Sequence, residues 1–258
     1  LNQSASGERI LNLLNPFNDA TPSYHHESIG GYHGAKLGRY QELIEYHLSP
    51  EIQELTSRIR EGNREMQDFG VLNMLNTKFI KFGDTPQQVI QNSSINGNAW
   101  FVQAIKKVNS ADEEINALGS IDTKETAVID VSKFGEISDF DPNNSYSSIE
   151  LTARDLNEIS YQYTSESGGL IVFSEIYYPK GWIATIDGQE TDILRANYVL
   201  RALLVPTGKH EIKFEFKPRI YTLGNRVSLV FGVLLYGSVL LLSAQPLLAK
   251  KVNTQQPF

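Results

Sequence analysis

Cysteine is absent from the 258 residues, which excludes disulfides, thiolate metal sites and a cysteine nucleophile. A long basic run is absent too: 23 Lys and Arg stand against 30 Asp and Glu, for a formal net charge of -7. We predict no nucleic-acid partner, because binding to phosphate backbones needs a basic patch. The sequence also has no GxSxG, no HExxH and no Gly-rich phosphate loop followed by Lys, so hydrolase and nucleotide-binding functions have no motif support.

What the chain does have is one long stretch without charged side chains. It runs from Val227 to Ala249 and is bracketed by Arg226 and by Lys250 and Lys251. In a helix it reaches roughly 35 Å, enough to cross a hydrocarbon core of about 30 Å. We therefore predict a transmembrane helix; the alternative is a buried core helix, which would need protein packed on every face. The opening LNQSASGER has no features of a signal peptide, so we expect a fragment whose upstream part holds further membrane helices.

Charges near this helix give a weak prediction of its orientation. Two lysines follow the helix, and four cationic residues precede it: Lys213, Lys217, Arg219 and Arg226. By the positive-inside rule this count would place the large N-terminal part in the cytoplasm. Long domains translocate largely regardless of such charges, and upstream helices usually dominate, so the count decides little.

The region from Thr126 to Phe216 is predicted to be a series of β-strands. Its segments are rich in β-branched and aromatic residues and are closely and regularly spaced, as in an all-β sandwich or barrel. The predicted strands are 126–131, 147–153, 158–164, 169–177, 182–186, 198–205 and 210–216. Turn residues separate them, as in Asp141 to Asn144, and Asp187-Gly188 is a strong hairpin signal. The most apolar segment, 169–177, is the predicted central strand.

Residues before 120 are predicted to mix helices and strands. Apolar residues at helical spacing predict helices over 37–48 and 51–59, with Ser49-Pro50 as the cap and first position of the second. A short helix over 69–75, strands over 77–82 and 100–108, and a helix after Ser110 complete this part. The full prediction is an α+β fold, divided into an α+β subdomain (1–120), an antiparallel β-sandwich (121–218), a juxtamembrane connection (219–226), one transmembrane helix (227–249) and a tail (250–258).

Five phrases, taken in order, carry a family resemblance. They are ERILNLLNPFNDATPSYHHESIGGYHGAKLGRYQELI, VLNMLNTKFI, NGNAWFVQAIKKVNSADEEINAL, YYPKGWIATIDGQE and VPTGKHEIKFEFKP. Together they resemble the C-terminal region of the YfhO family of bacterial multipass membrane proteins, in the form typical of the Bacteroides group. The resemblance covers nearly the whole chain, and the shared order makes it specific.

The resemblance implies a relation to membrane glycosyltransferases of the C superfamily, which use polyprenyl-phosphate sugars at the outer face of the cytoplasmic membrane. In such enzymes the essential acidic residue usually lies in the first outward-facing loop. The catalytic acid is then expected outside this chain. The resemblance also implies, against the charge count, that the soluble part is extracytoplasmic and that the tail lies in the cytoplasm.

The densest polar cluster in the sequence contains Tyr24, His25, His26, Tyr32 and His33, interspersed with glycines typical of a loop. A functional role would place the histidines at a phosphate or a sugar hydroxyl and the tyrosines against a sugar ring. The alternative is a polar surface loop that docks on the membrane part. The adjacent histidines lack the helical spacing of zinc ligands, and no metal or other cofactor is predicted.

Two further groups are candidates for substrate contact. Lys36 and Arg39 lie one helical turn apart and could meet a lipid phosphate, although solvated charges on an amphipathic helix are the more common case. Tyr177, Tyr178 and Trp182 could stack on carbohydrate. Packing at the end of the core or at the membrane surface is the favoured alternative for these aromatic residues.

Two hypotheses about function follow. In the first, the chain is the extracytoplasmic part of a YfhO-like, polyprenyl-phosphate-sugar-dependent glycosyltransferase of the cell envelope, in the bacterial cytoplasmic (inner) membrane. Its partners would be the lipid bilayer, the upstream transmembrane part, the polyprenyl-phosphate sugar and a glycan or glycolipid acceptor. In the second, the chain is a non-catalytic envelope module that binds glycan or protein. Acidic residues in an outward loop after the first upstream membrane helix would favour the enzyme.

Overall fold

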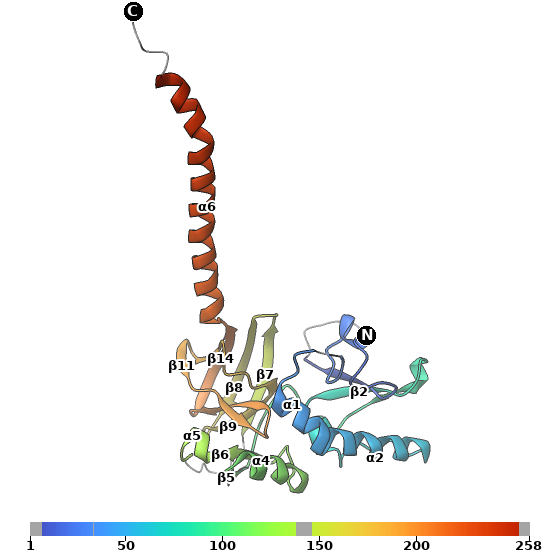
Figure 1. The fold of residues 1–258 in the computed structure, drawn as a ribbon. Coiled ribbons are helices and arrows are strands. Elements are labelled where there is room, and N and C mark those ends of the chain that lie inside the picture. Colours follow the sequence, from blue (N-terminus) through green and yellow to red (C-terminus); the bar gives the residue numbers. More distant parts are fainter. Residues whose placement is uncertain (1–6, 33, 138–145, 253–258) are drawn as a thin grey trace, which may run out of the picture. The chain divides into compact units, whose positions relative to one another are not determined.

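The computed structural model describes residues 7–32, 34–137 and 146–252, and within the last helix the side chains of residues 220, 221 and 224–242. The chain separates into two units, Leu1–Phe216 and Lys217–Phe258. We call the first unit the body; its strands and helices are seen in Figure 1. The predicted turn from Asp141 to Asn144 lies outside the described residues.

An antiparallel sheet of five strands forms one layer of the body, in the order β11-β10-β14-β8-β7. Its strands are β7 (Ser147–Arg154), β8 (Glu158–Ser165), β10 (Trp182–Ile186), β11 (Gln189–Thr191) and β14 (Gly208–Phe216). Tyr161 and Phe214 are fully buried while Gln162 on the next position of β8 is exposed, as alternating strands require. Asp187 and Gly188 join β10 to β11 with φ of 50° and 80°, which fits a type I′ turn and confirms the predicted hairpin.

A second antiparallel sheet faces the first, in the order β12-β13-β9-β4. Its strands are β4 (Ala99–Phe101), β9 (Gly169–Ile176), β12 (Leu194–Ala196) and β13 (Leu200–Val205). Six of the eight residues of β9 are buried, and β9 lies between β13 and β4. The prediction of 169–177 as a central strand is therefore confirmed.

The core between the two sheets is centred on aromatic rings. Phe173 from the second sheet lies 5.0 Å from Tyr161 and 4.9 Å from Phe214 of the first sheet, measured between ring centroids, in edge-to-face geometry. All three side chains are fully buried. Burial of side chains of this size contributes about 1.5–3 kcal/mol each. The predicted sandwich is thus confirmed, with inward-facing residues of both sheets forming its core.

The N-terminal part of the body combines a small mixed sheet with helices. The sheet has the order β1-β2-β3, with β1 parallel to β2, and its strands are β1 (Arg9–Asn12), β2 (Thr77–Lys81) and β3 (Val89–Gln91). The helices are η1 (Thr21–Tyr24), α1 (Gly38–Leu43), η2 (Ile44–Leu48), α2 (Ser49–Arg60), α3 (Gly70–Met74) and η3 (Pro86–Gln88). The predicted short helix that leads into a strand is present as α3 and β2.

The predicted break between two helices at Ser49-Pro50 is wrong. Helix α1 continues through the π-helical turn η2 directly into α2, and Leu48 and Ser49 both have helical backbone angles. Pro50 has no N–H to donate to the preceding turn, and a wider π turn ahead of it accommodates the missing hydrogen bond. One continuous helical segment, with a π turn in its middle, therefore replaces the two predicted helices.

Two strand predictions also need correction. The segment 126–131 does not join the sandwich, because β6 (Thr126–Asp130) pairs in parallel with β5 (Ala104–Val108). Three short helices complete this region: α4 (Ala111–Ala117), η4 (Leu118–Ser120) and α5 (Val131–Phe134). The segment 100–108 is two strands, β4 and β5. Between them the N–H groups of Val102 and Gln103 donate to Leu170 (3.1 Å) and Glu125 (2.7 Å), so the chain passes from one sheet to the other.

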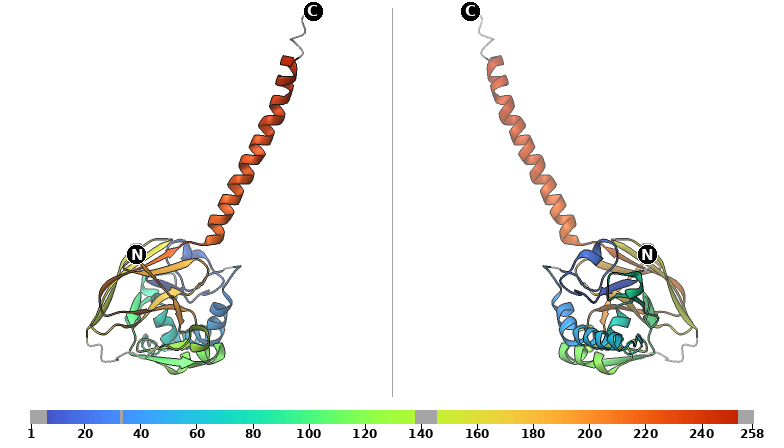
Figure 2. Two further views of the ribbon diagram at one scale, coloured as in Figure 1. Left: turned by 90° about the vertical axis from the view of Figure 1, so that its left-hand side faces the viewer. Right: turned by 90° about the vertical axis from the view of Figure 1, so that its right-hand side faces the viewer.

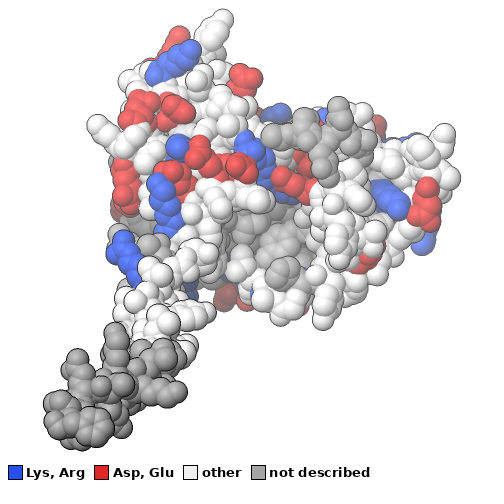
Figure 3. All heavy atoms as spheres, turned by 90° about the horizontal axis from the view of Figure 1, so that it is seen from above, with Lys and Arg blue, Asp and Glu red and all other residues white. Residues whose placement is uncertain are grey.

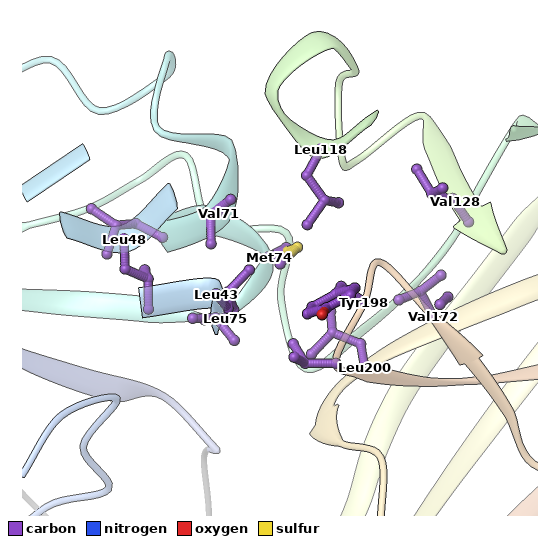
Figure 4. Close-up of a cluster of buried hydrophobic side chains, with 14 of the residues drawn as sticks. Leu43, Leu48, Val71, Met74, Leu75, Leu118, Val128, Val172, Tyr198 and Leu200 are labelled. Carbon is purple, nitrogen blue, oxygen red and sulfur yellow. The ribbon is translucent and has the colours of Figure 1, made fainter. Parts of the chain in front are cut away.

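Residues on both sides of position 120 share one hydrophobic cluster. Figure 4 shows Leu43 and Leu48 from the helices together with Val128, Val172 and Leu200 from the strands. All five side chains are buried. The boundary near residue 120 stays a prediction about domains, and the two segments that it separates pack around this common cluster.

The last helix, α6 (Arg219–Val252), is continuous in Figures 1 and 2. Within it, Gly224–Leu242 is long and apolar enough to cross a membrane, by length and composition. Its 19 residues reach about 28 Å, close to the thickness of a hydrocarbon core. Apolar side chains such as Leu229 and Phe231 are exposed by 69% and 66%, unlike those of a buried core helix. The prediction of one apolar C-terminal helix is confirmed.

Candidate functional site

Two adjoining pockets lie between the N-terminal helices and the second sheet of the body. The first has a volume of about 310 Å³ and the second about 260 Å³. Leu37, Tyr40 and Ile176 line both of them. Helix α1 supplies one wall of the pockets and the end of β9 supplies the other. The pockets are therefore formed by segments that lie far apart in the sequence.

The first pocket is built around the glycine pair Gly30 and Gly31. The N–H of Gly31 donates to the carbonyl oxygen of Pro16 at 2.9 Å, and a Cβ atom on Gly30 would lie 1.8 Å from that oxygen. This close approach requires glycine at position 30. Across the pocket, the Tyr40 hydroxyl donates to the carbonyl oxygen of Ile29 at 2.5 Å, and burial raises the pKa of Tyr40 to about 12. Tyr40 therefore remains a neutral hydrogen-bond donor.

Beneath the first pocket lies a chain of alternating charges. Arg9 and Arg154 both contact Glu175, at 3.2 Å and 2.7 Å, and Arg154 also forms a bidentate pair with Glu27, with both N···O distances at 2.8 Å. Burial opposes ionisation of Glu175, but Arg9 and Arg154 outweigh it and hold the pKa of this carboxyl below its usual value. The network joins β1, the segment after η1, β7 and β9 through charge-assisted hydrogen bonds.

The second pocket contains a cationic and aromatic cluster. The guanidinium of Arg39 lies 4.4 Å from the centre of the Tyr198 ring, within the range of a cation–π interaction. Behind it, fully buried Glu114 accepts hydrogen bonds from Arg195 (2.8 Å), Arg39 (3.3 Å) and the backbone N–H of Tyr198 (3.1 Å). Tyr198 also donates its hydroxyl to Glu42. Burial and this hydrogen bond raise the pKa of Tyr198 to about 12.

The structure unites two groups of candidates that are separate in the sequence. Lys36 lines the first pocket, and Arg39, Tyr177 and Tyr178 line the second. Trp182 does not line either pocket: its ring lies 5.3 Å from that of Phe216 and 4.0 Å from the guanidinium of Arg201. The substrate roles of these residues stay predictions, but four of the five share one region of the surface.

The glycines Gly30 and Gly31 of the predicted polar loop line the first pocket, but the described tyrosines and histidines of this loop do not. Tyr24, His25, His26 and Tyr32 are absent from the linings of both pockets. The rings of His25 and His26 meet edge to face at 6.5 Å, and Tyr24 and Tyr32 are exposed by 79% and 70%. His33 lies outside the described residues. A role for this loop in binding substrate stays a prediction.

Among the residues that sequence reasoning missed are two arginines and two tyrosines of the pocket linings: Arg9, Tyr40, Arg195 and Tyr198. Arg9 and Arg195 had a usable signal, because each is a charged residue next to or within a run of otherwise apolar strand residues. Tyr40 and Tyr198 had none, since a tyrosine on a helix or in a turn is common. Among the residues that the structure describes, no group of three or more His, Asp or Glu side chains is arranged to hold a metal ion.

Comparison with known families finds one match. Residues 143–228 match the model of a family described as bacterial membrane protein YfhO. The matched segment covers β7 to β14 and the beginning of α6, about a third of the chain. Neither the curated proteins nor the solved structures give a match. The match confirms the resemblance to the C-terminal region of a YfhO-family membrane protein, while the finer resemblance to the Bacteroides group stays a prediction.

Proposed function

We propose, with the YfhO match over residues 143–228 as the premise, that this chain is the extracytoplasmic C-terminal part of a polyprenyl-phosphate-sugar-dependent glycosyltransferase in the bacterial cytoplasmic membrane. The observation that supports this best is the pair of adjoining pockets, where cationic side chains lie beside tyrosines. Cations complement a phosphate, and flat aromatic faces complement a sugar ring. The body would hold the polar part of a lipid-linked sugar or of its glycan acceptor.

In this proposal the pockets bind and do not themselves carry out acid–base chemistry. Their described lining residues include Arg9, Lys36, Arg39 and Arg195 but no carboxylate. Three of these cations are already paired with the carboxylates of Glu175 and Glu114. The catalytic acid would belong to the upstream membrane part.

Lys36 is the cation best placed to meet an anionic ligand. Its Nζ atom lies 5.5 Å from the centre of the Phe17 ring, a contact that orients the ammonium group without neutralising its charge. The side chain lines the first pocket beside the Gly30-Gly31 backbone. We therefore expect Lys36 to contribute the principal contact with a phosphate.

The lack of a carboxylate in the described linings also favours a second candidate function. The body would then be a non-catalytic module that binds an envelope glycan through Tyr177, Tyr178 and the neighbouring cations. This module would need no lipid-linked sugar. The two functions differ in what happens to envelope glycans when the protein is removed.

The first test is mass spectrometry of envelope glycolipids and surface glycans from a strain lacking the gene, compared with its parent. The glycosyltransferase proposal expects one sugar to be missing from a defined acceptor and to return with the wild-type gene. Unchanged glycans, in a strain that has no second copy of the gene, would refute the enzyme and favour the binding module.

The pocket itself is tested by Lys36→Gln, with Lys124→Gln as a matched control that removes the same charge from an exposed position outside both pockets. The measurement is calorimetric titration of the full chain in lipid nanodiscs with polyprenyl phosphate. Loss of a charge-assisted hydrogen bond of about 1.5–3 kcal/mol should weaken binding roughly ten- to hundredfold, and the control should bind normally. Equal affinities of the two variants would remove Lys36 from the site.

A further inference from the structure

One end of the body carries exposed apolar side chains and is also the end at which the chain leaves for α6. We call it the exit end and define it by Phe216 at the end of β14, the turn 155–157 between β7 and β8, and η1. The N–H of Phe216 donates to the carbonyl oxygen of Asn157 at 2.9 Å, which places the turn beside the end of β14. Figures 1 and 2 show η1 and the β7–β8 turn at this same end of the body.

The apolar and aromatic residues at the tips of the exit end are highly exposed to solvent. Leu156, at the tip of the β7–β8 turn, is 90% exposed, and Tyr24 at the end of η1 is 79% exposed. A single exposed leucine is common on soluble proteins. Here it coincides with an exposed tyrosine and with the Trp182–Phe216 ring pair on the adjoining strands, and Trp and Tyr are enriched at membrane surfaces.

Covalent geometry keeps the exit end close to the membrane. Strand β14 ends at Phe216, α6 begins at Arg219, and the candidate span begins at Gly224. Three extended residues followed by five helical ones span at most about 18 Å. Phe216 is therefore held within that distance of the first residue of the span, whatever the angle between the body and α6.

The charges around this end do not favour attraction to lipids of one sign. Figure 3 shows the body from above, and the acidic and basic side chains that it displays are interspersed without a broad area of either sign. The ion pairs at this end, such as Arg154–Glu27 and Lys213–Glu158, combine both charges. Contact with a membrane surface would then depend on apolar side chains.

We propose that the exit end rests on the headgroup layer of the bilayer, with Leu156 and Tyr24 inserted among the headgroups. Lipid is the partner that we propose for this surface. The short connection from Phe216 to the candidate span keeps the exit end near the bilayer, and the exposed side chains are of the kind that partition into the interface. This contact fixes the height of the body above the membrane. It also gives exposed Tyr24 a role that the pockets do not provide.

The test uses the absence of cysteine from the chain, which lets one introduced thiol be labelled alone. Leu156→Cys is labelled with bimane in the full chain, in nanodiscs of phosphatidylcholine that contain a headgroup nitroxide lipid. The matched control is Tyr146→Cys, which is 75% exposed and precedes β7, at its other end. Eight strand residues at about 3.3 Å each separate the two labels by roughly 26 Å, so we expect about a twofold or larger loss of fluorescence at position 156 only.

Both alternatives to this result overturn the proposal. Equal quenching at the two positions would mean that the body has no preferred end toward the lipid. An unquenched label at position 156, in a protein whose far-ultraviolet circular dichroism matches the wild type, would mean that lipid does not cover the exit end. No lipid-linked sugar or polyprenyl phosphate is present, so the result is independent of the proposed function.

Discussion

Glu114 is a fully buried carboxylate behind the second pocket, and Glu114→Gln tests whether its charge holds that pocket together. The carboxylate accepts hydrogen bonds from Arg195, Arg39 and the backbone of Tyr198. Glutamine keeps the shape but loses the charge, which leaves the buried guanidinium of Arg195 without its main partner. Breaking a buried ion pair from one side costs about 3–5 kcal/mol. Asp130, 3.8 Å from the same Arg195 nitrogen, still opposes part of the charge, so we expect about 3 kcal/mol.

The assay is urea unfolding of the detergent-solubilised full chain, followed by tryptophan fluorescence. In thermal unfolding of the same sample, a loss of about 3 kcal/mol corresponds to a fall in Tm of roughly 6–12 °C for a body of this size. Asp112→Asn, on the exposed side of the same helix, is the matched control and should change stability by less than about 0.5 kcal/mol. A loss for Glu114→Gln no larger than that of the control would refute the reasoning, because it would mean that water screens this carboxylate from its arginines.

Two further pairs of variants test single contacts. Tyr161→Phe should leave the free energy of unfolding unchanged or raise it by about 1 kcal/mol, because the buried Tyr161 hydroxyl has no hydrogen-bond partner among the described residues. In the same urea titration Tyr163→Phe should lose about 1 kcal/mol, since its hydroxyl donates to a backbone carbonyl at 3.1 Å. Gly30→Ala should destabilise the body by about 1–3 kcal/mol in thermal unfolding, because its Cβ would collide with the carbonyl of Pro16, whereas Gly34→Ala meets open space and should be near neutral. Equal effects within either pair would contradict the contact concerned.

Most of the sandwich could be predicted because its signal is local. In β8 and β14 the alternation of side chains between core and solvent repeats every two residues, and Asp187-Gly188 fixes the hairpin between β10 and β11. The sheet to which β6 belongs could not be predicted in this way. Its sequence TAVID is as apolar as a sandwich strand, and its pairing with β5 in a separate parallel sheet depends on long-range packing.

The candidate site depends even more on long-range packing that local sequence patterns do not encode. Lys36 and Arg39 stand out in the sequence because they follow a glycine-rich loop, and Tyr177 and Tyr178 because they are adjacent aromatics. That Arg39 and the two tyrosines line one pocket follows from α1 packing near the end of β9, which no local pattern encodes. Arg195 is the exception, since a charge inside an apolar strand is visible in the sequence and indicates a buried partner.

The two proposals together constrain which part of a lipid-linked ligand reaches the body. Tyr178 lines the second pocket, and four residues further along the chain Trp182 pairs with Phe216 at the exit end. Those four residues span at most about 14 Å. If the exit end rests on the headgroups, as proposed, this distance keeps the tyrosines of the second pocket near the membrane surface, where the saccharide of a polyprenyl-phosphate sugar would lie. Affinity in the titration should therefore increase when the phosphate carries a saccharide, and Tyr178→Ala should abolish that increase while leaving binding of polyprenyl phosphate alone unchanged. An increase that survives Tyr178→Ala would place the saccharide elsewhere on the body.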